Sequence, residues 1–448
     1  MHRHFLGASL FLATALADPG SNYNVSSEFA LANGCGEKCQ QNVAAANTED
    51  LQIFGQNFDF DFYNTAANFS SSKAGDVLKI QPLDPKPLKV RSGTSVYRLQ
   101  YSSKDLDGSL VPATAFIALP FAPTKGRHGN STTYPLVAYA HGTSGIYRGC
   151  APSNGPNLYD YDSWQLLVER GYAVVATDYA GLGNNYTLHK YGSFIAQAND
   201  VYYSVVAARK AFDIFSKDWM SVGHSQGGAT AWKLSESKLV EHDHHYLGTV
   251  SLAPAARLWY MFRLNLKTKG AFLGYAPYHA KALQRAIPSY NLTVLAEPLR
   301  KRMAISDKAQ LCFDGLMSLS ADLTNEQIVS SAGIKQDDAK FQKWQDEMSP
   351  ATAGHRSYKS VLVVQGLNDS SVLPQATRKV YGDACRNGGE IHLREYPAME
   401  HSPVIAAAAP EWLAWVDDRF AHQATPGKCS ARVERPFDLS LVKAPAED

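Results

Sequence analysis

The sequence predicts an α/β fold in which a mostly parallel sheet is flanked by helices, and three observations support this. Short, continuous apolar runs such as residues 135–140 and 360–364 are typical of strands covered on both faces. Stretches with helical spacing alternate with these runs, as strand–helix–strand units require. At residues 221–228 an apolar strand leads through a Gly-x-Ser-x-Gly turn into a stretch of small residues, which is typical of a strand–turn–helix junction.

The elements follow in chain order. Two runs bounded by Gly, Pro and Ser predict an antiparallel hairpin that opens the sheet, at residues 96–101 and 113–119. The later strands are predicted at residues 135–140, 172–177, 220–222, 249–252, 360–364 and 391–396. Helices are predicted near residues 162–170, over 196–215, from 227 onward and over 411–422.

The sequence predicts six consecutive parts of the chain. They are a signal peptide at 1–17, an irregular N-terminal wrap at 18–90, a core at 91–253, a largely helical cap at 254–358, the second part of the core at 359–424 and a tail at 425–448. The cap falls between the sixth and seventh predicted strands, where the alternation of strand and helix lapses. The alternative is a structural subdomain unrelated to substrate.

The composition and net charge exclude some classes of binding partner. The 448 residues are 45% hydrophobic and 19% charged, with a net charge of +1, so neither nucleic acid nor an acidic surface is expected as partner. Arg3, an apolar run at 5–16 and small residues before Asp18 predict a cleaved signal peptide and secretion. The alternative is a buried N-terminal helix. No later run is apolar enough for a stable membrane span.

Cysteines and sequons agree with a secretory route. The six cysteines form an even set that allows 15 pairings, namely Cys35, Cys39, Cys150, Cys312, Cys385 and Cys429. Only Cys35 and Cys39 are close in sequence, and no nearby His or Cys pair completes a zinc site, so no metal is expected. Glycosylation is possible at Asn24, Asn68, Asn130, Asn185 and Asn291.

The Gly-x-Ser-x-Gly turn makes Ser225 the candidate nucleophile. A serine on so sharp a turn stands clear of its own backbone, so its hydroxyl can reach a carbonyl carbon. Three fixed positions are weak support alone, since chance produces them roughly 0.15 times in a chain of this length. The interpretation therefore depends on an acid and a histidine downstream and an oxyanion loop upstream.

The segment His-Gly-Thr-Ser-Gly at 141–145 is the candidate oxyanion loop. In the α/β-hydrolase fold, the loop after this strand supplies one backbone NH and the residue after the nucleophile supplies the other. Thr143 and Gln226 are therefore the predicted donors, and glycines permit a close backbone approach. The alternative is that the His-Gly pair merely turns the chain.

Asp369 and His401 complete the predicted triad. Each follows a predicted core strand, and the order Ser, Asp, His is the one expected of this fold. Among competing acids, Glu395 lies inside a strand, Glu400 adjoins His401 and Asp383 follows a predicted helix. His224 and His355 are decoy histidines. Asn368 is also in a sequon, and we expect it to be unglycosylated because it adjoins the acid.

Asp178 also follows a strand, where open α/β sheets gather their ligands. An aspartate in this position more often orders a loop, and we favour that role.

Five motifs together resemble the secretory lipase family of α/β-hydrolases, of the lipase A type. They are HGTSG at 141–145, CAPS at 150–153, TDYAGLG at 177–183, GHSQGG at 223–228 and QGLNDSSV at 365–372. The resemblance covers roughly residues 75–425. It implies the triad named above, a cap over the site and hydrolysis of carboxylic esters, in some members long-chain acylglycerols. It also implies pairing of Cys150 with Cys312 and of Cys385 with Cys429, which leaves Cys35 with Cys39.

The sequence thus predicts a secreted serine hydrolase that cleaves small-molecule esters or lipids through an acyl-enzyme, without a cofactor. An apolar cap favours a hydrophobic acyl group and a transient contact with a lipid interface. The alternatives are an aminopeptidase, an acyltransferase of secondary metabolism, or a binding protein that has kept the fold without activity.

Overall fold

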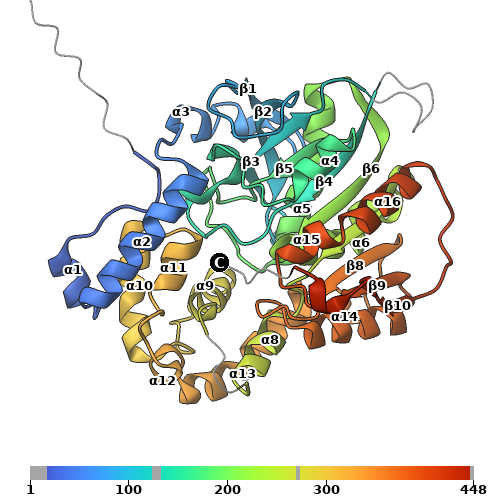
Figure 1. Cartoon of the computed structure of the whole chain (residues 1–448). Helices are drawn as coiled ribbons and strands as arrows, with labels where there is room; N and C mark the ends of the chain where they lie inside the picture. Colours follow the sequence, from blue (N-terminus) through green and yellow to red (C-terminus); the bar gives the residue numbers. More distant parts are fainter. Residues whose placement is uncertain (1–17, 124–132, 269–272, 444–448) are drawn as a thin grey trace, which may run out of the picture.

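A computed structural model describes residues 18–123, 133–268 and 273–443. Across these ranges the strands form a ten-stranded sheet in the order β1-β2-β3-β5-β4-β6-β7-β8-β9-β10 (Figure 1). The strands are β1 (Val77–Pro82), β2 (Ser95–Lys104), β3 (Leu110–Leu119), β4 (Tyr134–Ala140), β5 (Ala173–Thr177), β6 (Phe215–His224), β7 (Tyr246–Leu252), β8 (Val361–Gly366), β9 (Ile391–Tyr396) and β10 (Ser430–Val433).

The sheet is antiparallel at one edge and parallel elsewhere. β1, β2, β3 and β5 pair antiparallel, and the predicted hairpin is β2–β3. From β5 to β10 every pairing is parallel. In the middle of the sheet Val222 is in register with Tyr139 on one side and Val250 on the other. The carboxyl ends of the central strands therefore meet along one edge.

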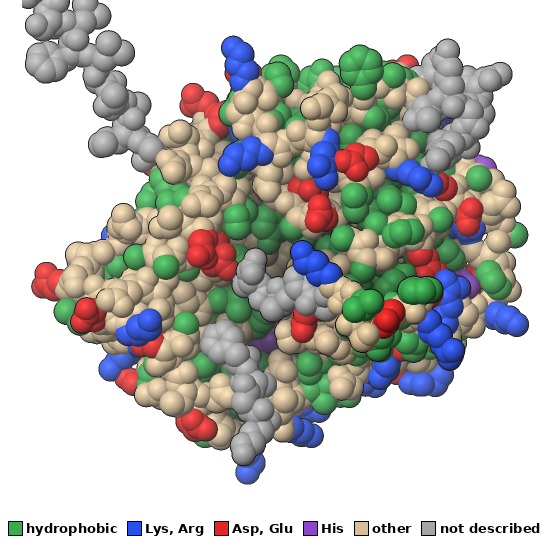
Figure 2. All heavy atoms as spheres, viewed as in Figure 1, with side chains coloured by type: hydrophobic (Ala, Val, Ile, Leu, Met, Phe, Trp, Pro, Cys, Tyr) green, Lys and Arg blue, Asp and Glu red, His purple; other side chains and the backbone are tan. Residues whose placement is uncertain are grey.

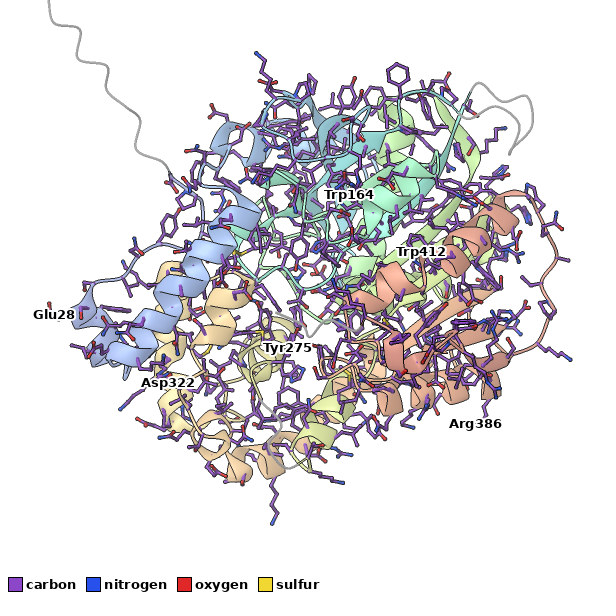
Figure 3. All side chains as sticks on the ribbon, viewed as in Figure 1. Glu28, Trp164, Tyr275, Asp322, Arg386 and Trp412 are labelled. Atoms are coloured by element: carbon purple, nitrogen blue, oxygen red, sulfur yellow. A yellow bond between two sulfur atoms is a disulfide. The ribbon has the colours of Figure 1, made fainter. Side chains whose placement is uncertain are left out.

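Helices cover both faces. The core helices are α4 (Trp164–Glu169), α5 (Phe194–Ala211), α6 (Gln226–Ser235), α7 (Lys238–Glu241), α14 (Pro374–Arg386), α15 (Pro403–Ala407) and α16 (Ala409–Phe420). Trp164 of α4 and Trp412 of α16, both labelled in Figure 3, belong to one buried cluster with Val222. Val201 of α5 packs on the opposite face, in a cluster with Ala138. Because side chains alternate along a strand, β4 contributes to both clusters.

An insertion separates β7 from β8, and its described residues form six helices: α8 (Leu258–Asn265), α9 (Ala276–Ala286), α10 (Glu297–Ala309), α11 (Phe313–Ser318), α12 (Asn325–Ile328) and α13 (Ser331–Met348). The predicted helical cap corresponds to this insertion. The insertion follows the seventh strand, not the sixth, because β1 was not predicted. A buried aromatic cluster holds α8 to α13, with the rings of Trp259 and Phe341 stacked 4.2 Å apart.

The N-terminal segment 18–90 is not the irregular wrap that we predicted. It contains α1 (Ser27–Ala32), α2 (Glu37–Phe54), α3 (Phe60–Tyr63), a 3₁₀ turn (Phe69–Ser71) and β1. Cys39, Val43 and Ala46 recur at helical spacing and are buried along α2. This helix packs against α11 of the insertion, and the two lie side by side in Figure 1.

The described part of the tail contains a strand, β10, that we did not predict. β10 pairs parallel with β9, with Ser430 opposite His392. The disulfide between Cys385 and Cys429 joins the tail to α14, so it holds the residue before β10 next to the sheet. This covalent constraint explains why a short polar segment extends the sheet.

The described structure contains three disulfides, Cys35–Cys39, Cys150–Cys312 and Cys385–Cys429. These are the pairs that the family resemblance implies. The bond from Cys150 to Cys312 joins two positions 162 residues apart and ties the insertion to the core.

Acidic and basic side chains are interspersed over the face drawn in Figure 2. Among the described residues, no helix combines the length and hydropathy needed to cross a bilayer. The candidate glycosylation sites Asn24, Asn68, Asn185 and Asn291 are exposed. The predicted signal peptide at 1–17 and Asn130 lie outside the described residues.

Candidate active site

Ser225 occupies the turn between β6 and α6. Its backbone lies at φ 57° and ψ −119°, a conformation with positive φ that L residues rarely adopt. The turn is held from both sides, since Ser225 N donates to Leu252 O (2.9 Å) and Ala255 N donates to Ser225 O (3.0 Å). Strain of this kind costs about 1–3 kcal/mol and persists only where the surroundings enforce it.

Two glycines permit this turn because the backbone leaves no room for a Cβ atom. A Cβ on Gly223 would lie 2.2 Å from the carbonyl oxygen of Gly227. A Cβ on Gly227 would lie 1.9 Å from the carbonyl oxygen of Ala140. The Gly-x-Ser-x-Gly pattern is therefore required by the packing of α6 against the ends of β4 and β6.

Asp369 and His401 form a buried pair at the ends of β8 and β9. The Nδ1 atom of His401 lies 2.8 Å from Oδ2 of Asp369, and the two residues are 6% and 3% exposed. A carboxylate only accepts hydrogen bonds, so Nδ1 carries the proton and Nε2 has a lone pair. Asp369 also accepts from Gln365 Nε2 (2.9 Å) and Val372 N (2.6 Å), which fixes its orientation.

The pair lies next to the nucleophile turn. The ring of His401 is 4.5 Å, between centroids, from the ring of His224, the residue before Ser225. Ser225 also shares a cavity with Val372, the residue that donates to Asp369. The structure therefore brings the three predicted triad residues together at the carboxyl edge of the sheet.

The competing acids are engaged elsewhere. Glu395 pairs with Arg378 (2.7 Å). Glu400 accepts from the backbone of Ser370 (3.2 Å). Asp383 lies on α14, where it pairs with Arg257 (3.2 Å) and with Arg386, a residue labelled in Figure 3.

The decoy histidines differ from His401 in their surroundings. His224 is buried against Tyr161, whose hydroxyl lies 3.0 Å from its Nδ1, and burial lowers the pKa of His224 well below its usual value. His355 is exposed and does not line the cavity at Ser225.

Thr143 lies beside Ser225 in the same cavity, on the loop after β4. Its hydroxyl is 3.0 Å from the hydroxyl of Tyr191, and its carbonyl accepts from Tyr159 (2.5 Å). Gln226 is the first residue of α6, where a backbone NH has no partner within the helix. Sequence reasoning missed the two tyrosines that hold this loop, because no motif marks them.

Asp178 has the structural role that we favoured. Its buried carboxylate accepts from Ser153 N (2.8 Å), Ser153 Oγ (2.5 Å) and Thr114 Oγ1 (2.6 Å). These bonds tie the CAPS segment to β3, and burial raises the pKa of Asp178.

Asn368 and Asp369 are adjacent but differ in environment. Asn368 is exposed and Asp369 is buried. The absence of a glycan at Asn368 stays a prediction, but a glycan there would leave the carboxylate of Asp369 in place. Occupancy of this sequon is therefore no longer a test of the acid.

The cavity at Ser225 is small and is partly lined by the insertion. It measures about 30 Å³ and is lined by Thr143, Tyr191, Ser225, Ala255, Leu258, Met261, Phe262, Asn265, Tyr275, His279, Ser371 and Val372. Half of these belong to α8, to α9 or to the residue before α9, Tyr275, which is labelled in Figure 3. Such a volume holds little more than ordered water. A cavity of this size is too small for an ester.

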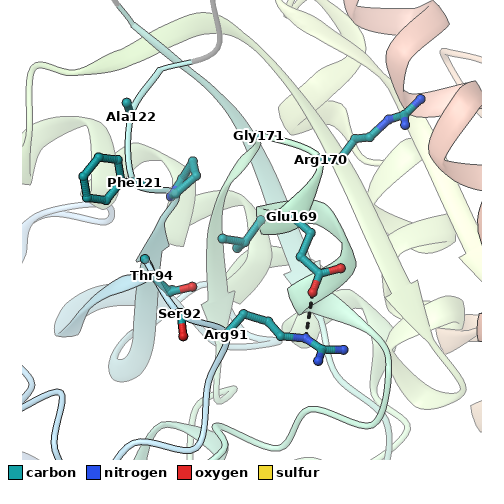
Figure 4. Close-up of a pocket in the computed structure, with 11 residues that line it drawn as sticks. Arg91, Ser92, Thr94, Phe121, Ala122, Glu169, Arg170 and Gly171 are labelled. Carbon is teal, nitrogen blue, oxygen red and sulfur yellow. Dashed lines mark ion pairs between the residues drawn. The ribbon is translucent and has the colours of Figure 1, made fainter.

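A larger cavity of about 560 Å³ lies elsewhere, between the ends of β2 and β3 and the end of α4. Figure 4 shows Arg91 and Glu169 paired across one side of it (2.7 Å). None of the predicted site residues lines it.

The parallel sheet, the strained serine turn and the acid–histidine pair at successive strand ends define an α/β-hydrolase. Solved structures agree on the fold. Candida antarctica lipase A aligns over 83% of this chain and 89% of its own, with a TM-score of 0.65 and 14% identity. The rice cell wall degrading esterase LipA from Xanthomonas oryzae aligns over 79% of this chain and 98% of its own, with a TM-score of 0.59 and 16% identity.

The family is defined by sequence. The family model described as "Secretory lipase" matches residues 159–427. Lipase 10 and Lipase 6 of Candida albicans are each 23% identical to the chain, over 404 and 402 residues, or 83% of both partners. The chain belongs to the secretory lipase family and is an ester-hydrolysing enzyme. The resemblance found in the sequence is thus confirmed.

Proposed function

We propose that the protein is a secreted serine hydrolase that cleaves carboxylic esters through an acyl-enzyme. The observation that carries this proposal is the strained turn at Ser225 beside the buried pair of His401 and Asp369. A serine hydroxyl, an imidazole with a lone pair on Nε2 and a fixed carboxylate are the three groups that acyl transfer requires.

In the first half-reaction, Ser225 Oγ attacks the ester carbonyl carbon while Nε2 of His401 takes the hydroxyl proton. Asp369 stabilises the resulting imidazolium through Nδ1–H. The backbone NH groups of Thr143 and Gln226 hold the oxyanion, and the dipole of α6 adds positive potential there. The bond to the alcohol then breaks, and His401 gives its proton to the departing oxygen.

In the second half-reaction, water attacks the acyl-enzyme and His401 takes its proton. Collapse of the tetrahedral intermediate releases the acid, and the proton returns to Ser225. The enzyme regains its starting state, and the net change is addition of water across the ester bond.

The substrate pocket favours an apolar group. Apart from the reacting groups, its walls include Leu258, Met261, Phe262 and Val372. The exposed Leu266 and Ile287 follow α8 and α9 directly, and we propose that they contact a lipid interface transiently. Secretion is supported by the three disulfides and by the predicted signal peptide. We also propose residues 254–358 as the cap and residues 91–253 with 359–424 as the catalytic core.

Labelling with a fluorophosphonate tests the nucleophile. The wild-type protein should be labelled, and Ser225→Ala should not. The matched control Ser251→Ala removes a buried hydroxyl on the neighbouring strand β7 and should still be labelled. Absence of labelling in the folded wild type would favour a binding protein.

A panel of substrates then identifies which type of bond the enzyme cleaves. p-Nitrophenyl esters of increasing chain length should be hydrolysed, and aminoacyl anilides should not. Turnover of anilides alone would indicate an aminopeptidase. Ester formation with an added alcohol that outpaces hydrolysis would indicate an acyltransferase.

A further inference from the structure

His279 is a polar residue of the insertion that reaches the cavity at Ser225. It lies on α9, is 6% exposed and lines the same cavity as Ser225 and Thr143. Its ring meets the ring of Phe262 on α8 edge to face, with centroids 5.2 Å apart. The packing of two insertion helices therefore fixes the imidazole.

The hydrogen-bonding capacity of the imidazole is incompletely satisfied. Among the described residues, Nδ1 of His279 is buried and has no hydrogen-bond partner. In the same cavity, the hydroxyls of Thr143 and Tyr191 lie 3.0 Å apart and pair with each other. A buried polar atom without a partner lowers stability, so its presence in a reactive cavity points to a ligand group.

The protonation state limits which group this can be. Burial lowers the pKa of His279 to about 4, so the ring is neutral near pH 7. A neutral imidazole offers one N–H donor and one lone pair. A hydroxyl group can either donate to Nδ1 or accept from it, so it suits either tautomer of the ring. A charged substituent would lose its hydration among Leu258, Met261 and Phe262.

We propose that His279 determines specificity by hydrogen-bonding a free hydroxyl group on the ester substrate. This inference rests on the proposed ester hydrolysis. The hydroxyl belongs either to the acyl chain or to the alcohol, as in a partial glyceride. The amide of Asn265, on α8, and the ring of Tyr275 line the same cavity.

Two pairs of soluble esters test the proposal. Ethyl β-hydroxyhexanoate is compared with ethyl hexanoate for the acyl side, and glyceryl monohexanoate with propyl hexanoate for the alcohol side. For each pair, the selectivity is the ratio of kcat/KM for the hydroxylated ester to kcat/KM for the plain ester, measured by pH-stat titration.

In either the acyl-side pair or the alcohol-side pair, His279→Leu and His279→Phe should each lower the selectivity roughly tenfold, the value of one hydrogen bond. The pair that responds shows which part of the substrate carries the hydroxyl. His279→Gln keeps a donor and an acceptor and should stay within about threefold of wild type. His355→Leu makes the same change at an exposed site outside the cavity and should leave the ratio unchanged.

Unchanged selectivity in both pairs, in variants that melt cooperatively and accept the fluorophosphonate, would overturn the role of His279. If Leu and Phe prevent folding, loss of selectivity in the folded His279→Gln variant would equally contradict it. Failure of the wild type to hydrolyse any ester would instead refute the proposed function.

Discussion

Nδ1 of His401 lies 2.8 Å from Oδ2 of Asp369, in a site from which water is almost excluded. The carboxylate is held by two further donors, Gln365 and Val372. Its position is therefore fixed before any substrate arrives, and so is the imidazole tautomer. A group that must orient a base benefits from such preorganisation, because no reorganisation is needed during the reaction.

The Asp369→Asn variant should lose about four orders of magnitude in kcat, because an amide stabilises the wrong tautomer of His401. Hydrolysis of a p-nitrophenyl ester measures this loss. The control is Glu400→Gln, at the competing carboxylate beside His401, which should cost less than about tenfold. Equal losses in both variants would contradict the assignment of Asp369.

Gly227→Ala should abolish labelling by a fluorophosphonate, because its Cβ would lie 1.9 Å from the carbonyl oxygen of Ala140. The backbone of the Gly-x-Ser-x-Gly turn must shift to accept this Cβ, and Ser225 shifts with the turn. The control is Gly382→Ala in α14, where the Cβ would lie 3.4 Å from its nearest neighbour, the flexible side chain of Arg386. That variant should gain about 0.5–1 kcal/mol in stability. Full labelling of Gly227→Ala would show that the Gly-x-Ser-x-Gly turn tolerates a side chain at this position.

Replacing Cys150 and Cys312 together with serine should lower both stability and activity. The bond spans 162 residues, and Cys312 also bridges to Gly145 in the oxyanion loop. We expect a loss of roughly 2–5 kcal/mol in the free energy of unfolding. The same change at Cys385 and Cys429 should reduce stability but leave kcat/KM nearly intact, since that bond ties only the tail. Thermal unfolding and ester kinetics separate the two effects.

Asp200 is a buried residue of α5 whose carboxyl accepts from Ser103 Oγ (2.5 Å), and Asp200→Asn should change the pH dependence of stability. Burial raises the pKa of Asp200 from 3.8 to about 7. Between these values the folded chain keeps a proton that the unfolded chain has lost, so the free energy of unfolding falls as pH rises. The shift of about 3 units corresponds to about 4 kcal/mol, lost between roughly pH 4 and pH 7.

Asparagine cannot titrate, so the variant should gain on the wild type as pH rises through this window. Denaturant unfolding of both proteins at about pH 4 and about pH 8 measures the change. A stability difference that stays constant between the two pH values would contradict a raised pKa at Asp200.

The sequence allowed the core and the triad to be predicted because both depend on local signals. Buried parallel strands appear as continuous apolar runs, and the residues at their carboxyl ends are fixed by chain order. Ser225, Asp369 and His401 could therefore be placed without knowledge of any contact. The structure confirms the parallel sheet and places these residues at one edge.

Other elements depend on contacts that a sequence does not display. β1 carries Lys79 and ends at Pro82, so it lacks a strand pattern and is formed by pairing with β2. The spacing of Cys39, Val43 and Ala46 did indicate a helix, but the polar residues between them obscured it. His279 could not be predicted at all, because only the packing of α9 over Ser225 makes it part of the site.

The backbone at Ser225 has a further consequence for how this enzyme can be improved. Glycine adopts positive φ without strain, so Ser225→Gly should melt at a higher temperature than the wild type while being inactive. Stability and catalysis thus compete at one position. Any selection for heat resistance that does not also require turnover will favour loss of the nucleophile.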